Sequence, residues 1–156
     1  MIKTIKGNVL DAPITYICHQ VNCKGVMGAG LAKQIKDKWP QVYYDYRTEC
    51  IYNPVEELMG GILISRLNDN VKIVHMFAQN EYGINKRQTD YEAFESCLNK
   101  IATSISNKDY TTIRFPYGIG CGLAGGDWSI IQNLIQKVLG EYNVEFYLFD
   151  PNSMEI

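Results

Sequence analysis

The sequence lacks the features of secreted, disulfide-stapled and membrane proteins. Its five cysteines are odd in number, never form a Cys-x-x-Cys pair and follow no signal peptide, so we expect reduced thiols in a cytoplasmic protein. No apolar run approaches the ~20 residues of a membrane span, so no membrane partner is expected. An excess of one charge is also absent. Fifteen Lys and Arg against seventeen Asp and Glu leave a net charge of −2, which argues against a protein that clamps duplex DNA by its phosphates.

What is present is the composition of an ordinary globular domain. The 156 residues are 46% hydrophobic, 21% charged and 12% aromatic, and a chain of this length can bury a core without staples. Neither a low-complexity segment nor an internal repeat divides the chain. We therefore predict a single domain over residues 1–156, which we expect to be a monomer.

Short β-branched runs alternate with stretches of helical period, which indicates an α/β fold. Several runs are nearly all apolar, as is typical of strands covered on both faces. Turn residues at 68–70 separate two of the runs and predict an antiparallel hairpin over residues 61–78 in an otherwise mixed sheet. The predicted strands are residues 2–6, 14–21, 61–67, 71–78, 111–116 and 144–149.

Four helices are predicted from apolar stripes and end signals. Residues 91–106 carry one stripe, with Thr89 or Asp90 as the cap. Residues 127–139 carry another, with Asp127 as N-cap and Gly140 after the end. A third helix is predicted over residues 30–38. Pro40 then opens a further short helix that continues to Tyr46.

Glycines are concentrated in two loops, each between a predicted strand and a predicted helix. We call residues 25–30 the first glycine loop and residues 118–126 the second glycine loop. Residues without Cβ allow close backbone approach, and the following helix N-terminus offers unpaired amides, so the two loops together predict an anion cradle. The second loop contains no Lys or Arg, which favours a pyrophosphate held by main-chain amides.

Two better-known phosphate motifs are excluded. Neither loop ends in Gly-Lys-Ser/Thr, so there is no P-loop. Residues 120–125 do fit Gly-x-Gly-x-x-Gly, but only one helix and one strand follow them, so a dinucleotide-binding βαβαβ half cannot be built there.

The segments "CHQVNCKGVMGAGLAKQIKDKWPQVYYDY", "FAQNEYG", "TDYEAF" and "IRFPYGIGCGLAGGDW" resemble the macrodomain family. The resemblance runs from Gly7 to Phe149. It is to the bacterial and phage branch, near the ADP-ribose 1″-phosphate phosphatases and the terminal ADP-ribose protein glycohydrolases. It implies a three-layer α/β/α fold with a mixed central sheet, and a cleft for ADP-ribose or a derivative at the carboxyl ends of the strands.

The resemblance also implies which residues bind the ligand. The second loop holds the pyrophosphate, opposed by the first loop around the terminal ribose, and Asn22 bonds a ribose hydroxyl, a turn asparagine being its alternative role. Asn8 stands where many macrodomains carry an aspartate that accepts a hydrogen bond from the adenine amino group. Phe149 matches an aromatic residue that stacks on adenine, a core residue being its alternative role. The implied ligand-binding residues are Asn8, Val9, Asn22, Gly25, Val26, Met27, Gly28, Ala29, Gly30, Gly118, Ile119, Gly120, Cys121, Gly122, Leu123 and Phe149.

Three residues are predicted to take part in catalysis. The His19 imidazole precedes the first loop and can act as a general base or orient a water, a buried and hydrogen-bonded histidine being the alternative. Asn22 positions the terminal ribose. Asp127 can orient a water beside the distal ribose or cap the helix that follows it.

No cofactor and no metal site are expected. Adjacent Cys18 and His19 point to opposite faces of a strand, so they do not share a tetrahedral ion. Cys121 is a weak candidate nucleophile because no histidine is tied to it in the sequence, although a helix N-terminus can lower a thiol pKa.

One departure from the family concerns a lysine. Relatives that cleave ADP-ribose from glutamate or DNA place a nucleophilic lysine after the fourth strand, where this chain reads Phe77-Ala78-Gln79. We therefore expect a hydrolase that uses bound water on ADP-ribose 1″-phosphate or on ADP-ribosylated protein or nucleic acid. The alternatives are a non-catalytic ADP-ribose-binding module and, more remotely, a binder of another nucleotide or of a nucleic-acid end.

Overall fold

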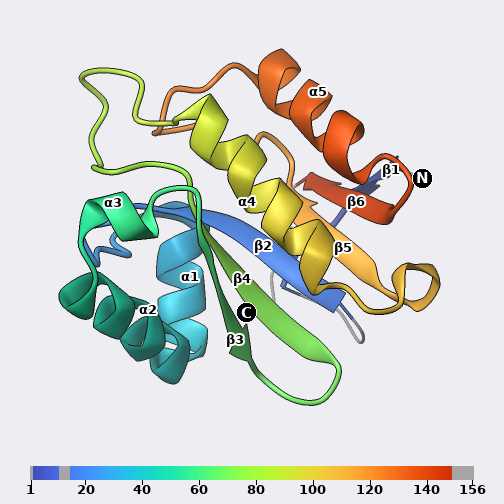
Figure 1. Cartoon of the computed structure of the whole chain (residues 1–156), viewed down its shortest axis with the longest axis horizontal. Helices are drawn as coiled ribbons and strands as arrows, with labels where there is room; N and C mark the ends of the chain where they lie inside the picture. Colours follow the sequence, from blue (N-terminus) through green and yellow to red (C-terminus); the bar gives the residue numbers. More distant parts are fainter. Residues whose placement is uncertain (1, 11–14, 149–156) are drawn as a thin grey trace.

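The computed structural model describes residues 2–10 and 15–148, which form a six-stranded sheet between two helical layers (Figure 1). The strand order is β1-β6-β5-β2-β4-β3. Strand β3 runs antiparallel to β4, and the other strand pairs described are parallel. The strands are β1 (Ile2–Lys6), β2 (Thr15–Val21), β3 (Ile62–Arg66), β4 (Val71–Phe77), β5 (Thr112–Pro116) and β6 (Asn143–Leu148).

The helices begin where the sequence offers a start signal. Pro40 occupies the first turn of its helix, Asp90 accepts a hydrogen bond from the Ala93 amide, and Asp127 accepts one from the Ser129 amide. These three starts confirm the predicted ones. The helices are α1 (Gly30–Lys38), α2 (Pro40–Tyr52), α3 (Val55–Leu58), α4 (Tyr91–Ser104), the 3-10 helix η1 (Lys108–Tyr110) and α5 (Trp128–Leu139).

Alternation along the central strands separates two cores. Cys18 and Val74 face α4 and α5, whereas Ile17 and Ile73 pack with Ile35 of α1 on the other face. The three-layer α/β/α fold is thereby confirmed, and so is the mixed sheet with its hairpin of β3 and β4.

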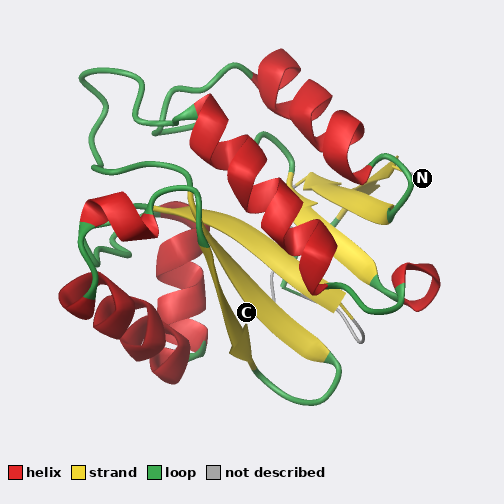
Figure 2. Ribbon diagram, in the orientation of Figure 1, coloured by secondary structure: helices red, strands yellow, loops and turns green. Residues whose placement is uncertain are grey.

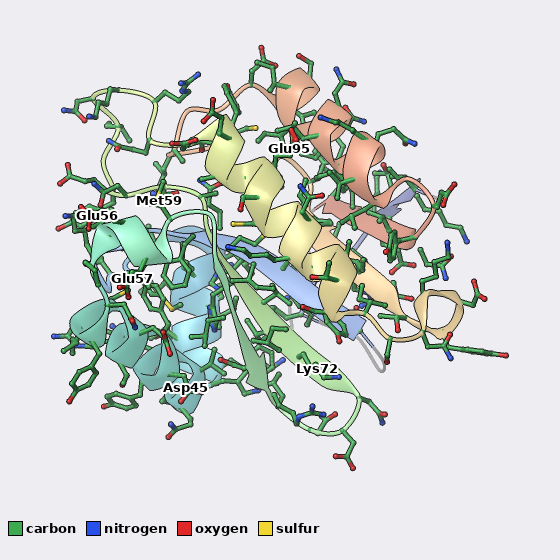
Figure 3. All side chains as sticks on the ribbon, in the orientation of Figure 1. Asp45, Glu56, Glu57, Met59, Lys72 and Glu95 are labelled. Atoms are coloured by element: carbon green, nitrogen blue, oxygen red, sulfur yellow. The ribbon has the colours of Figure 1, made fainter. Side chains whose placement is uncertain are left out.

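Charged side chains of the helices lie at the surface, and Figure 3 labels Glu56, Glu57 and Glu95 among them. Glu95 of α4 pairs with Lys137 of α5 at 3.1 Å. Glu56 and Glu57 lie in the first turn of α3, where negative charge is favourable.

Three local features were not predicted. Helix α2 continues to Tyr52, six residues beyond the last residue whose spacing indicated a helix, because its second half buries no side chain and so leaves no apolar stripe to read. The short helices α3 and η1 were also missed, since one turn is too brief for periodicity. Gly140 follows α5 as predicted, but with a right-handed φ of −60°.

The loops that follow β2, β4 and β5 meet at one end of the sheet, because these strands are parallel (Figure 2). The loop between β4 and α4 lies beside the second glycine loop. Both Gln88 and Thr89 donate backbone hydrogen bonds to the carbonyl of Ala124. This end of the sheet is where the sequence analysis places the site.

Candidate functional site

A pocket of about 530 Å³ lies between the two glycine loops at the carboxyl ends of the parallel strands. It brings together ten of the predicted site residues. Other predicted residues, namely Asn8, Val9, Gly25, Met27, Gly118, Cys121 and Asp127, do not line it, and Phe149 lies outside the described residues. Those on its wall are His19, Asn22, Val26, Gly28, Ala29, Gly30, Ile119, Gly120, Gly122 and Leu123.

The first glycine loop is held in shape by Asn22. Its Oδ1 accepts hydrogen bonds from the amides of Lys24 (3.0 Å) and Val26 (3.3 Å), and its Nδ2 donates to the Val26 carbonyl at 2.8 Å. The buried Tyr46 hydroxyl lies 2.7 Å from the same Oδ1. Asn22 thus fills the alternative role of a turn asparagine, and its contact with a ribose stays a prediction.

Helix α1 begins at this loop without a side-chain cap. Ala29 is the N-cap residue and offers no hydrogen-bonding group, while Gly30, Leu31 and Ala32 of the first turn line the pocket. The first amides of a helix need partners from outside it. The N-terminus of this nine-residue helix therefore lies at the pocket without a side-chain cap. An anion can bind there.

The second glycine loop is shaped by its neighbours. Thr89 Oγ1 donates to the Gly120 carbonyl at 2.6 Å, and the Gly126 amide donates to the same oxygen at 2.9 Å. Gly120 has φ +75°, and a Cβ there would lie 2.8 Å from Gln20 Oε1, so only glycine fits. Gly122 and Leu123 line the pocket, and their amides donate to no acceptor among the described residues.

His19 is buried and paired with the other histidine of the chain. His19 Nε2 lies 2.7 Å from His75 Nδ1, and His75 Nε2 lies 3.0 Å from Ser65 Oγ. Burial lowers the pKa of His19 to about 3, and burial together with the neighbouring His19 lowers the pKa of His75 well below its usual value. Both imidazoles are therefore neutral near pH 7.

A second polar network holds Gln79, in the loop that follows β4. Gln20 Nε2 donates to Gln79 Oε1 at 2.8 Å and lies 2.9 Å from Thr89 Oγ1, and Gln79 Nε2 donates to the Glu81 carbonyl at 2.7 Å. Gln20 and Gln79 line the pocket. The network connects β2, the loop after β4 and, through Thr89, the second glycine loop.

Several residues of the pocket wall are not among the predicted site residues. Gln20 and Gln79 flank predicted features but belong to no motif, and Tyr82 and Ile84 come from the loop after β4. Tyr82 and Ile84 are 59% and 80% exposed. Only their position in a loop that follows a buried strand could have suggested them.

Asn8 is 4% exposed and lies away from the pocket wall. Its Oδ1 accepts a hydrogen bond from the Leu10 amide at 2.9 Å, and its buried Nδ2 has no partner among the residues that the structure describes. The bond to Leu10 fixes the orientation of the amide. The free group at this position is therefore a donor.

Asp127 and Cys121 lie outside the pocket wall. The Asp127 carboxylate accepts from the Ser129 amide (2.8 Å) and hydroxyl (2.6 Å), and these bonds lower its pKa. Burial and the charge of Asp127 raise the pKa of the Cys121 thiol to about 11. The thiolate is therefore disfavoured, contrary to the lowering that a helix N-terminus can produce.

The described residues contain neither a metal-binding cluster nor a membrane-spanning helix. No group of three His, Cys, Asp or Glu side chains lies close enough to hold an ion there. Cys18 and His19 do point to opposite faces of β2, since Cys18 packs with the α4 and α5 core while His19 pairs with His75. Within residues 2–10 and 15–148, no helix has the length and apolar character needed to cross a bilayer.

Residues 18–135 match the family model described as Macro domain. A DNA ADP-ribosyl glycohydrolase of Thermus aquaticus is 26% identical over 152 residues, which are 97% of this chain and 41% of that protein. An ADP-ribose 1″-phosphate phosphatase of Saccharomyces cerevisiae is 25% identical over 173 aligned positions, with 94% of this chain and 97% of that protein covered.

Among solved structures, Thermosipho africanus DarTG in complex with ADP-ribose aligns with a TM-score of 0.76 and 22% identity. The alignment covers 99% of this chain and 43% of that one. At this identity the likeness shows the fold alone. The chain spans about two fifths of the length of the first curated relatives that it matches.

Proposed function

Since the chain belongs to the macro domain family, we propose that its pocket binds ADP-ribose and that the protein hydrolyses a bond at the terminal ribose with a bound water. The substrate is ADP-ribose 1″-phosphate or an ADP-ribosylated macromolecule. With the phosphate ester, the water oxygen bonds to phosphorus, the bond from phosphorus to the 1″ oxygen breaks, and a water proton ends on that oxygen. With an ADP-ribosylated macromolecule, the water oxygen bonds to the 1″ carbon, the bond from this carbon to the macromolecule breaks, and a water proton ends on the released group.

The observation that carries the binding proposal is the set of unpaired main-chain amides on the pocket wall. Gly122 and Leu123 offer them from the second loop, and the uncapped start of α1 offers them from the first. Of the described residues, no Lys or Arg lines the pocket. A pyrophosphate held by amides and a helix N-terminus suits such a wall, and the volume is within the range of small-molecule sites.

The chemistry proposed for hydrolysis depends on what stands at position 79. Gln79 has no nucleophilic amine, and both ends of its amide are hydrogen-bonded. A covalent lysine intermediate therefore cannot form at residue 79. We propose water as the nucleophile instead. The phosphatase of Saccharomyces cerevisiae and the glycohydrolase of Thermus aquaticus suggest the two leaving groups to test.

A second candidate function is recognition of ADP-ribose without turnover. The hydrogen bonds of Gln79 favour this second function, because they connect the loop after β4 to Gln20 of β2. A binding module needs that rigidity and no reactive group.

Titration calorimetry with ADP-ribose, and with AMP and NAD as controls, tests the binding proposal. We expect micromolar or tighter binding of ADP-ribose, about 8 kcal/mol or more. Release of phosphate from ADP-ribose 1″-phosphate and of ADP-ribose from modified protein and DNA then separates the two candidates. Absence of ADP-ribose binding would refute both, tight binding without turnover would leave the module, and a trapped lysine adduct would contradict the water mechanism.

Asn8→Asp tests the base end of the ligand. The substitution keeps the oxygen that accepts from Leu10 and replaces the unpartnered Nδ2 donor by an acceptor. If this position faces the adenine amino group, the variant gains a hydrogen bond to it. We expect the ratio of affinities for ADP-ribose and its hypoxanthine analogue to rise about tenfold. An unchanged ratio in parallel titrations would show that Asn8 does not contact the base.

A further inference from the structure

Three buried polar side chains form a hydrogen-bonded chain that leads from the edge strand to the pocket wall. Ser65 of β3, His75 of β4 and His19 of β2 are 4%, 0% and 2% exposed. The distances are 3.0 Å from Ser65 Oγ to His75 Nε2 and 2.7 Å from His75 Nδ1 to His19 Nε2. His19 belongs to the pocket wall, and its remaining nitrogen, Nδ1, is buried with no partner in the part of the chain that the structure describes.

The direction of these hydrogen bonds follows from the Ser65 hydroxyl. Among the described residues, His75 Nε2 is the one acceptor within hydrogen-bond distance of this hydroxyl. A buried hydroxyl hydrogen without an acceptor is costly, so Ser65 donates to His75 Nε2.

The position of each imidazole proton then follows in turn. A neutral imidazole has one N–H and one acceptor nitrogen. Because His75 Nε2 accepts, the His75 proton is on Nδ1, which donates to His19 Nε2. The His19 proton is therefore on Nδ1 as well.

This accounting requires that both rings are neutral, since a protonated imidazole donates from both nitrogens. Burial lowers the pKa of both histidines far enough to keep them neutral at pH 7. Tyr46 covers His75 from the helical side, with ring centroids 5.9 Å apart and an interplanar angle of 27°.

We propose that Ser65 and His75 are positioning residues that hold His19 with its proton on Nδ1, so that the ring nitrogen beside the pocket wall is a hydrogen-bond donor instead of a general base. A hydroxyl or phosphoryl oxygen of the ligand is the chemical group that pairs with such a donor. The ligand's identity as ADP-ribose rests on the proposed function, whereas the tautomer does not.

Proton–nitrogen correlation spectra of the imidazole rings at pH 7 test the tautomer directly. The chain has two histidines, so four ring nitrogens are observed and a His75→Asn variant assigns them. We expect a protonated Nδ1 and an unprotonated Nε2 in both rings. A His19 ring protonated on Nε2 would overturn the proposal, whether or not ADP-ribose binds.

Ser65→Ala and Ser65→Thr form a matched pair for the role of the hydroxyl. Ser65→Ala removes the one donor to His75 Nε2 within residues 2–10 and 15–148, so both rings should populate the other tautomer as well. Ser65→Thr keeps a hydroxyl and should keep the spectrum of the original protein. An unchanged tautomer in Ser65→Ala would show that Ser65 does not set it.

ADP-ribose titrations of the same pair test the donor's contact with the ligand. We expect Ser65→Ala to bind about 3- to 10-fold more weakly, the effect of one hydrogen bond, and Ser65→Thr to bind as the original protein does. Equal affinity despite a changed tautomer would show that His19 does not donate to the ligand. Loss of ADP-ribose binding by the original protein would refute the proposed function and leave the spectra to decide on the positioning residues.

Discussion

Gly122→Val should abolish ADP-ribose binding and leave the fold intact. Gly122 lines the pocket, its φ lies outside the left-handed range, and an added Cβ would meet no atom within 4 Å. The valine side chain thus costs no backbone strain and occupies space that the ligand needs beside an unpaired amide. We expect affinity to fall at least about 100-fold, or ~2.7 kcal/mol, with a melting temperature within about 2 °C of the original protein.

Gly126→Ala is the matched control for this prediction. Its Cβ would lie 2.6 Å from the carbonyl oxygen of Gly120, a backbone atom of the same loop, and Gly126 does not line the pocket. This variant should lower the melting temperature, because the loop must shift. Thermal unfolding and calorimetry on both variants separate the effects. If Gly122→Val bound ADP-ribose with unchanged affinity, the second glycine loop would not be the pyrophosphate site.

Features that depend on neighbouring residues were predictable from the sequence. The starts of α4 and α5 follow from Asp90 and Asp127, each a side chain that accepts from an amide two or three residues later. The two glycine loops were identified because the glycines are adjacent in the chain and lie between a strand and a helix. The fold places both loops around one pocket because their strands are parallel neighbours in the sheet.

Features that depend on strand register were not predictable. His19 and His75 are 56 residues apart and become partners because β2 and β4 align them directly. The sequence left a catalytic and a buried, hydrogen-bonded His19 as alternatives, and only the register reveals the second. Likewise, the Tyr46 hydroxyl of α2 is hydrogen-bonded to Asn22, which follows β2. The helical period of the sequence does not encode this contact.

The hydrogen bonds of Gln79 also could not be predicted from the sequence. The absence of a lysine was visible in the sequence, but the reason Gln79 suits its place was not. Its partner Gln20 comes from β2, and Gln20 also donates to Thr89 in the loop before α4. Three short polar contacts thus hold the loop after β4 in place where the resemblance implies a lysine in some relatives, which is consistent with the proposal that water is the nucleophile.

Acid should destabilise the protein through its buried histidines, and this is the second large effect that we expect. The pKa of His19 is lowered by burial from about 6.5 to about 3, and that of His75 is lowered in the same direction. The unfolded chain therefore binds more protons than the folded one between these values, so stability rises with pH there. It is fully present above about pH 6.5 and is lost as the pH falls toward 3.

His19 alone should cost the folded state about 2 kcal/mol at pH 5 relative to pH 7, and His75 adds a cost of the same sign. Urea unfolding at pH 7, 6 and 5 measures the free energy of unfolding directly, with a flat region expected between pH 7 and 8. The double variant His19→Gln/His75→Gln removes both titrating groups, so its stability should change little between pH 6.5 and 5 even though its core is weaker. A double variant that kept the slope would assign the acid sensitivity to carboxylates. If the free energy of unfolding of the original protein did not change with pH, the two imidazoles would gain protons equally in the folded and unfolded states. They would then be protonated without leaving their buried site.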